Sequence, residues 1–178
     1  TQVITLVAEH GKITDRTEDE AANIMSAGEL VLNAETIASN SDGDLDINVA
    51  GFDVTTTSES AGTAEIESLN AAGTSLRQAT VTGALTITVH QGALNILGDV
   101  SANSALFNLA AETTPANVRS IIQAEGTKIQ FKGAGTMLAT GGAVLSDLSV
   151  LIGDLIILAG GSVLDGSATS EDANITMG

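Results

Sequence analysis

The amino-acid sequence predicts an all-β protein built as a parallel β-helix, a solenoid of about eight rungs. In residues 83–89, Leu85, Ile87 and Val89 alternate with two threonines, the pattern of a strand with one buried face. Similar glycine-led units begin at Gly28 and Gly43 and recur at intervals of about 20 residues. With no Trp, no Tyr and three Phe, the core must be filled by stacked aliphatic side chains.

Composition restricts the partners. The formal net charge of -16 disfavours nucleic acid and anionic lipid, and it favours divalent cations. The absence of cysteine excludes disulfides and thiolate sites. The most apolar stretch, residues 144–158, is interrupted by Asp147 and Asp154, so it predicts two buried strands and no membrane insertion.

The chain is expected to form one domain, residues 1–178, or a segment of a longer repetitive chain. Residues 1–14 predict a long strand, a turn at Gly11 and a short strand. Residues 17–27 interrupt the pattern. They predict either a short helix capped by Thr17 or an acidic surface loop.

From Gly28 onward, the rungs are aligned on their inward residues. In this alignment Leu30 and Leu32 stack beneath Leu45 and Ile47, and Leu106 occupies an inward position further along. Residues 114–125 form a second interruption, since Thr114 and Pro115 suit a helix start. The alternative is a strand at residues 120–123.

Asp42, Asp44 and Asp46 have the alternating spacing of a calcium loop, so they are the candidate metal ligands. The EF-hand signature is incomplete, because position 53 is Asp and not Glu. On a strand, Asp44 and Asp46 share one face, and the alternative is an ordinary solvated surface. No other cofactor is predicted.

Catalytic signals are weak. His10 and His90 lack the spacing of a metal pair or of a hydrolase triad, which predicts two surface histidines and no catalytic residues. Acidic pairs such as Glu65 and Glu67 keep a polysaccharide lyase or hydrolase as an alternative, although sugar clefts usually carry Trp or Tyr. Asn174 begins an N-glycosylation sequon.

The repeats at residues 28–34, 43–50 and 83–89 resemble those of filamentous-haemagglutinin-like proteins, which are secreted or surface proteins of bacteria. The resemblance implies a right-handed parallel β-helix and an adhesive role. From it we expect an extracellular or cell-surface rod, filament or surface-layer component. Its partners would be further copies, neighbouring repeats of the same chain or surface glycans. A calcium- or glycan-binding module is a further alternative.

Overall fold

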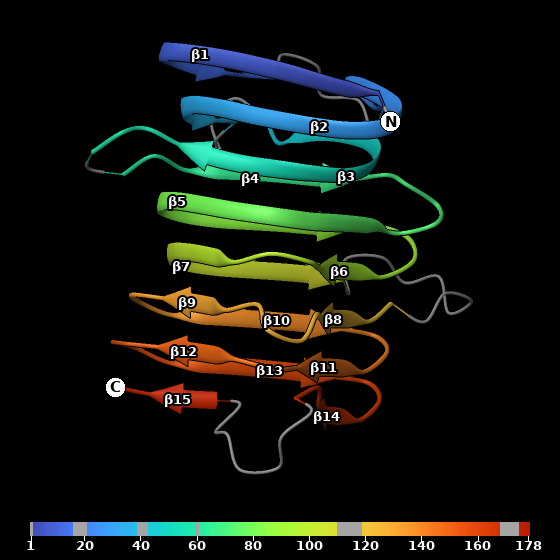
Figure 1. Ribbon diagram of the computed structural model, residues 1–178, viewed down its shortest axis with the longest axis vertical. Coiled ribbons are helices and arrows are strands. Elements are labelled where there is room, and N and C mark those ends of the chain that lie inside the picture. The colour runs from blue at the N-terminus through green and yellow to red at the C-terminus, as the bar shows by residue number, and fades with distance from the viewer. Residues whose placement is uncertain (1, 16–20, 39–42, 60, 110–118, 168–174) are drawn as a thin grey trace.

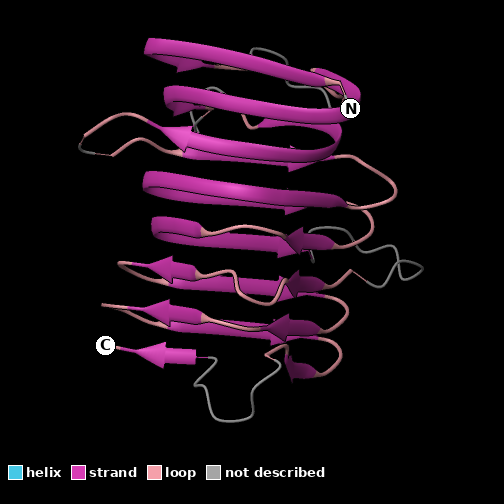
Figure 2. Cartoon of the chain, in the orientation of Figure 1, coloured by secondary structure: helices cyan, strands magenta, loops and turns pink. Residues whose placement is uncertain are grey.

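The computed structural model describes residues 2–15, 21–38, 43–59, 61–109, 119–167 and 175–178. These residues form strands, turns and loops, with no helix among them (Figure 2). Within these ranges, therefore, no helix is long and apolar enough to cross a membrane. The strands are β1 (Val3–Ile13), β2 (Ile24–Ile37), β3 (Leu45–Thr56), β4 (Ala64–Ser68), β5 (Thr74–Val89), β6 (Leu94–Ile96), β7 (Val100–Leu109), β8 (Ile121–Gln123), β9 (Ile129–Phe131), β10 (Gly135–Ala139), β11 (Ala143–Leu145), β12 (Leu148–Val150), β13 (Leu155–Ala159), β14 (Val163–Asp165) and β15 (Ile175–Met177).

The strands coil into about seven turns that are stacked along the longest axis of the molecule, with the two termini at opposite ends (Figure 1). Every strand pairing between the turns is parallel, from β1 with β2 at one end to β12 with β15 at the other. The prediction of an all-β parallel solenoid is confirmed.

Three hydrogen-bonded ladders run along the axis. We number them and identify each by the strands in which it ends. The first ladder ends with β6, β8, β11 and β14. The second ends with β9, β12 and β15. The third ends with β7, β10 and β13. Long strands bend from one ladder into the next, so that β5 contributes to all three.

Each ladder buries one column of side chains and exposes the next, because successive residues of a strand point to opposite faces. In the second ladder, eight aliphatic residues stack in one inward column, and the six central ones are at most 1% exposed. This column consists of Leu6, Leu32, Val54, Ala79, Val100, Ile129, Leu148 and Ile175. Burying such a column in each ladder produces one continuous hydrophobic core.

Two stacked glycines form one of the corners. Gly73 precedes β5 and Gly92 precedes β6, and their φ angles are 88° and 71°. A side chain at Gly92 would collide with the backbone of Gly73 in the neighbouring turn. This corner therefore requires glycine for both its backbone conformation and its close packing.

The predicted register was wrong in two places. Leu30 pairs with Phe52 and not with Leu45, because Leu45 lies in the third ladder opposite Ile66. Leu106 points outward, and Phe107 takes the inward position in its place. Both errors arise because neighbouring apolar residues allow two registers, and a shift of one residue exchanges the faces of a strand.

Where the segments at residues 17–27 and 114–125 are described, the helical alternative is wrong, and the alternative of a strand at residues 120–123 is confirmed. Ile24 begins β2 and pairs with Ile47, and residues 121–123 form β8. Pairing with the neighbouring turns satisfies the backbone there, and it outweighs a short helical pattern. Residues 17–20 and 114–118 lie outside the described residues.

The outward column of the third ladder changes from carboxylates to aliphatic side chains along the axis. It begins with Asp46 and Glu67, continues through Thr88 and Asn108, and ends with two leucines, Leu138 and Leu158. Leu158 is 62% exposed. The column therefore begins with two buried carboxylates and ends with the exposed Leu158.

Candidate functional site

Three carboxylates meet at the acidic end of the third ladder. Asp46 in β3 and Glu67 in β4 are direct neighbours across the parallel pair, and Asp44 lies two residues before Asp46. One carboxylate oxygen from each of the three lies within 4.8 Å of the others. We call Asp44, Asp46 and Glu67 the acidic cluster.

The cluster is less accessible than a strand surface usually is. Asp46 is 4% exposed and Glu67 is 8% exposed, while Asp44 is half-buried. The segment that leads into β2 is paired with β3 at this point, because the backbone N–H of Asp46 donates to Asn23 Oδ1 at 3.0 Å. In return, the N–H of Asn23 donates to the Asp46 carbonyl at 2.9 Å. For Asp46, the alternative of a solvated outer face is therefore wrong.

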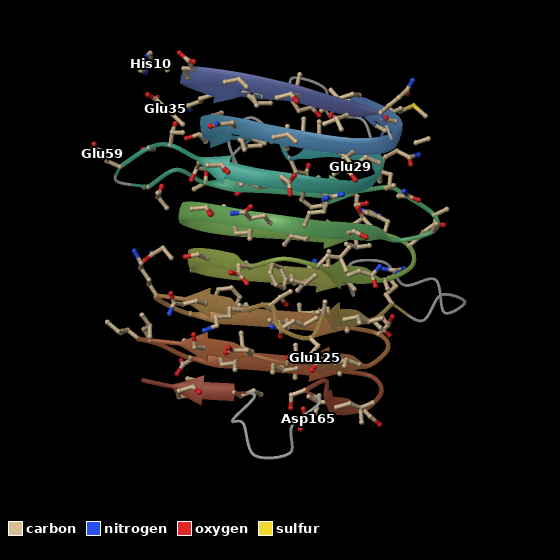
Figure 3. The ribbon with its side chains drawn as sticks, viewed as in Figure 1. His10, Glu29, Glu35, Glu59, Glu125 and Asp165 are labelled. Atoms are coloured by element: carbon tan, nitrogen blue, oxygen red, sulfur yellow. The ribbon has the colours of Figure 1, made fainter. Side chains whose placement is uncertain are left out.

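His90 lies beside the cluster, at the end of β5. Its Nε2 atom contacts Oε1 of Glu67, and its backbone N–H donates to the Ser68 carbonyl at 3.1 Å. A protonated His90 would balance part of the negative charge of Glu67. His10, by contrast, lies at the N-terminal end of the molecule (Figure 3).

A shallow hollow of about 260 Å³ adjoins the acidic cluster. It is lined by Gly43, Asp44, Glu65, Ile66 and Thr86, so a fourth carboxylate faces the same region. Clustered carboxylate oxygens are suitable ligands for Ca²⁺, which takes six to eight oxygens and accepts flexible geometry. The arrangement has the donor chemistry to bind such an ion.

The sequence predicted part of this cluster. Asp44 and Asp46 lie together as their spacing indicates, whereas Asp42 lies outside the described residues, as does Asn174. Glu67 and His90 were missed as members, because they come from the two following turns. The sequence did indicate that Glu67 lies beside Asp46, since Glu67 follows Asp46 by about one repeat length.

A second charged group crosses three turns on the first ladder. Arg77 pairs with Glu29 although Gly51 lies in the turn between them. A Cβ atom at Gly51 would lie 3.5 Å from Cδ of Arg77, so glycine leaves room for the arginine side chain. Burial raises the pKa of the neighbouring Asp53 carboxyl, Arg77 opposes this rise, and Glu29 adds to it.

All three phenylalanines are in the core. Phe52, Phe107 and Phe131 are 0% exposed, and the chain has no Trp or Tyr. No aromatic ring is therefore available on the surface to stack on a sugar.

Comparison of the chain with protein-family models, with curated proteins and with solved structures finds no match in any of the three. The functional argument consequently depends on the geometry of this molecule.

Proposed function

We propose that this protein is an extracellular structural or adhesive rod without catalytic activity. The observation that carries the proposal is the continuity of the fold: inward columns of apolar side chains pass through all the described turns. A body of this kind is stiff along its axis, since every turn is hydrogen-bonded to the turns on either side. The resemblance of its repeats to those of filamentous-haemagglutinin-like proteins favours a place on a bacterial surface.

The surface supports a passive role over a carbohydrate-active one. Lyases and hydrolases that act on acidic polysaccharides need cations to neutralise the uronate groups, and sugar clefts commonly use aromatic platforms. All the phenylalanines are buried, and Arg119, one of six basic residues, is only 1% exposed. The acidic cluster would repel an anionic polymer.

Protease treatment of intact cells that express the protein tests its location. An extracellular rod is degraded or released by protease added outside the cells, while a cytoplasmic control protein remains intact. Protection of the rod until the cells are lysed would contradict the proposal. Small-angle scattering of the purified chain should also give an elongated particle.

A second candidate function is calcium binding, favoured specifically by the acidic cluster. Isothermal titration with Ca²⁺ should give saturable binding that is lost in the Asp46→Asn variant. Glu125→Gln serves as the control because Glu125 is exposed and lies on another part of the molecule (Figure 3). Equal heats of Ca²⁺ binding for the wild type and both variants would exclude a specific calcium site at the acidic cluster.

A further inference from the structure

The last described turn of the solenoid exposes side chains in columns that the central turns bury. Val163, Ile175 and Met177 are 50%, 41% and 49% exposed. Their neighbours one turn earlier in the same columns are Ala143, Leu148 and Val150, which are at most 1% exposed. Among the described residues, strands β13, β14 and β15 each pair with a single neighbouring strand, so the other edge of each has no strand partner there. We call these three strands the C-terminal layer.

The opposite end has the same property. Within the part of the chain that the structure describes, β1 pairs only with β2, and its inward residues Ile4, Leu6, Ala8 and Ile13 are partly buried against the core. Ile24, at the start of β2, belongs to the same group. We call these five residues and the free edge of β1 the N-terminal layer.

The two layers match when the columns are continued from one molecule into the next. Leu6 begins the column that ends at Ile175, and Ile13 begins the column that ends at Leu155. A second copy placed one strand spacing, about 4.8 Å, beyond the C-terminal layer would pair these residues and bury them.

The C-terminal and N-terminal layers also match in shape. The column that begins at Ile24 ends at Ala139 and Ala159, whose small side chains leave space. These two alanines help to line an apolar hollow of about 530 Å³, together with Ile157 and Val163. The isoleucine of a second copy would therefore lie over the two alanines.

Charge disfavours one of the possible contacts between two copies. Fourteen of the 22 acidic residues precede residue 68, with only Lys12 and Arg16 to balance them. Contact between two N-terminal layers would bring these charges together, whereas contact between unlike layers keeps them apart. Charge thus disfavours contact between two N-terminal layers, and the continuation of the inward columns favours the head-to-tail contact. A repeated head-to-tail contact that does not close produces an open filament.

We propose that the C-terminal layer binds the N-terminal layer of a second copy of this chain, continuing the parallel ladders from one molecule to the next. This contact deepens the proposed rod function and rests on it, because it names the partner that would extend the rod.

One residue opposes the contact. Asp165 occupies the column that begins with Ile4 and contains Leu30, Phe52 and Leu145. Its Oδ1 atom accepts hydrogen bonds of 2.7 Å from both N and Oγ of Ser167. It lies at the end of the molecule opposite the N-terminus (Figure 3). A charge at an inward position of an edge strand is a known means of limiting edge-to-edge association. The contact should therefore be reversible, and removing this charge should strengthen it.

Sedimentation velocity of the full 178-residue chain over a range of concentrations tests the proposal. We expect the wild type to form a series of oligomers larger than dimers. Ile175→Lys should weaken the association about tenfold or more, because it places a charge in the contact. Asp165→Asn should strengthen it several-fold. Thr176→Asp is the matched control, since Thr176 points outward on the same strand, and it should leave the association unchanged.

A wild type that remains monomeric up to about 1 mM would overturn the proposal, as would association that stops at dimers. Equal weakening by Ile175→Lys and Thr176→Asp would indicate a lateral contact and contradict the proposal. Association of Asp165→Asn that equals that of the wild type would show that Asp165 does not lie in the contact, which also contradicts the proposal. A chain that is monomeric but accessible to protease on intact cells would overturn this contact and leave the proposed rod function standing.

Discussion

Asp46 and Glu67 are direct neighbours in the parallel pair of β3 and β4, and both carboxylates are more than nine-tenths buried. Like charges that face each other on adjacent strands are destabilising, and burial reduces their screening by solvent. The acidic cluster is therefore a place where the fold carries a cost.

Replacing Asp46 with Asn should relieve that cost. In the presence of a chelator we expect a gain of about 1 kcal/mol or less in the free energy of unfolding. Such a gain corresponds to a rise of about 2 °C in Tm, measured by circular dichroism. Glu125→Gln should leave Tm unchanged. A fall in Tm for Asp46→Asn without any cation would mean that its charge is stabilising.

The raised pKa of Asp53 predicts that the stability of the protein depends on pH. Its folded-state pKa is raised above 3.8, chiefly by burial. The folded chain therefore binds more protons than the unfolded chain at pH values between 3.8 and the raised pKa. The Asp53 charge opposes folding above this window, and that effect disappears as the pH falls through the raised pKa.

Asp53→Asn should consequently be more stable than the wild type at pH 7, and the difference should shrink as the pH falls toward 3.8. Urea unfolding at several pH values measures it, with the exposed Glu59→Gln as the control. A stability difference that grows on acidification would refute the assignment.

A substitution at Ile87 tests how much the stacked core contributes to stability. It is 0% exposed and lies between Ile66 and Phe107 in the third ladder. Ile87→Asp would bury an unpaired charge, and we expect a loss of more than about 4 kcal/mol or failure to fold. Thr80→Asp, at an exposed outward position of the same strand, should change stability by less than about 0.5 kcal/mol. A folded Ile87→Asp protein of wild-type stability would contradict the described core.

Gly135 provides a test of packing between turns. A Cβ atom at this position would overlap the ring of Phe131 and would lie 3.4 Å from Cδ1 of Leu155. Because the ring is fully buried, Gly135→Ala should destabilise the protein by about 1–3 kcal/mol. Gly11→Ala is the matched control, since nothing lies within 4 Å of its Cβ position. Equal melting temperatures for the two variants would show that the ring moves freely.

The fold class was predictable because its signals are local. The alternation of Leu85, Ile87 and Val89 identifies a strand, and the repeated glycines identify the period. The register was not predictable, because every turn contains similar aliphatic pairs. Leu106 and Phe107 are both apolar, and only packing against the adjacent turns selects which of them points inward.

The candidate site was predictable only where its residues are close in sequence. The spacing of Asp44, just before β3, and Asp46, within β3, brings the two carboxylates together. Glu67 and His90 join them through the stacking of turns, which depends on corner lengths that vary from repeat to repeat. Asn23 accepts a hydrogen bond from the backbone of Asp46, and no local pattern in the sequence indicates that contact.

Phe107 and Phe131 lie in adjacent turns and pack edge to face, with ring centroids 6.0 Å apart and an interplanar angle of 75°. Since the chain contains no Trp or Tyr, its near-ultraviolet spectrum comes from its three phenylalanines alone. Conventional absorbance and fluorescence would barely detect this protein. The fine structure of its phenylalanine circular dichroism, however, would be a native optical reporter of how two adjacent turns fit together.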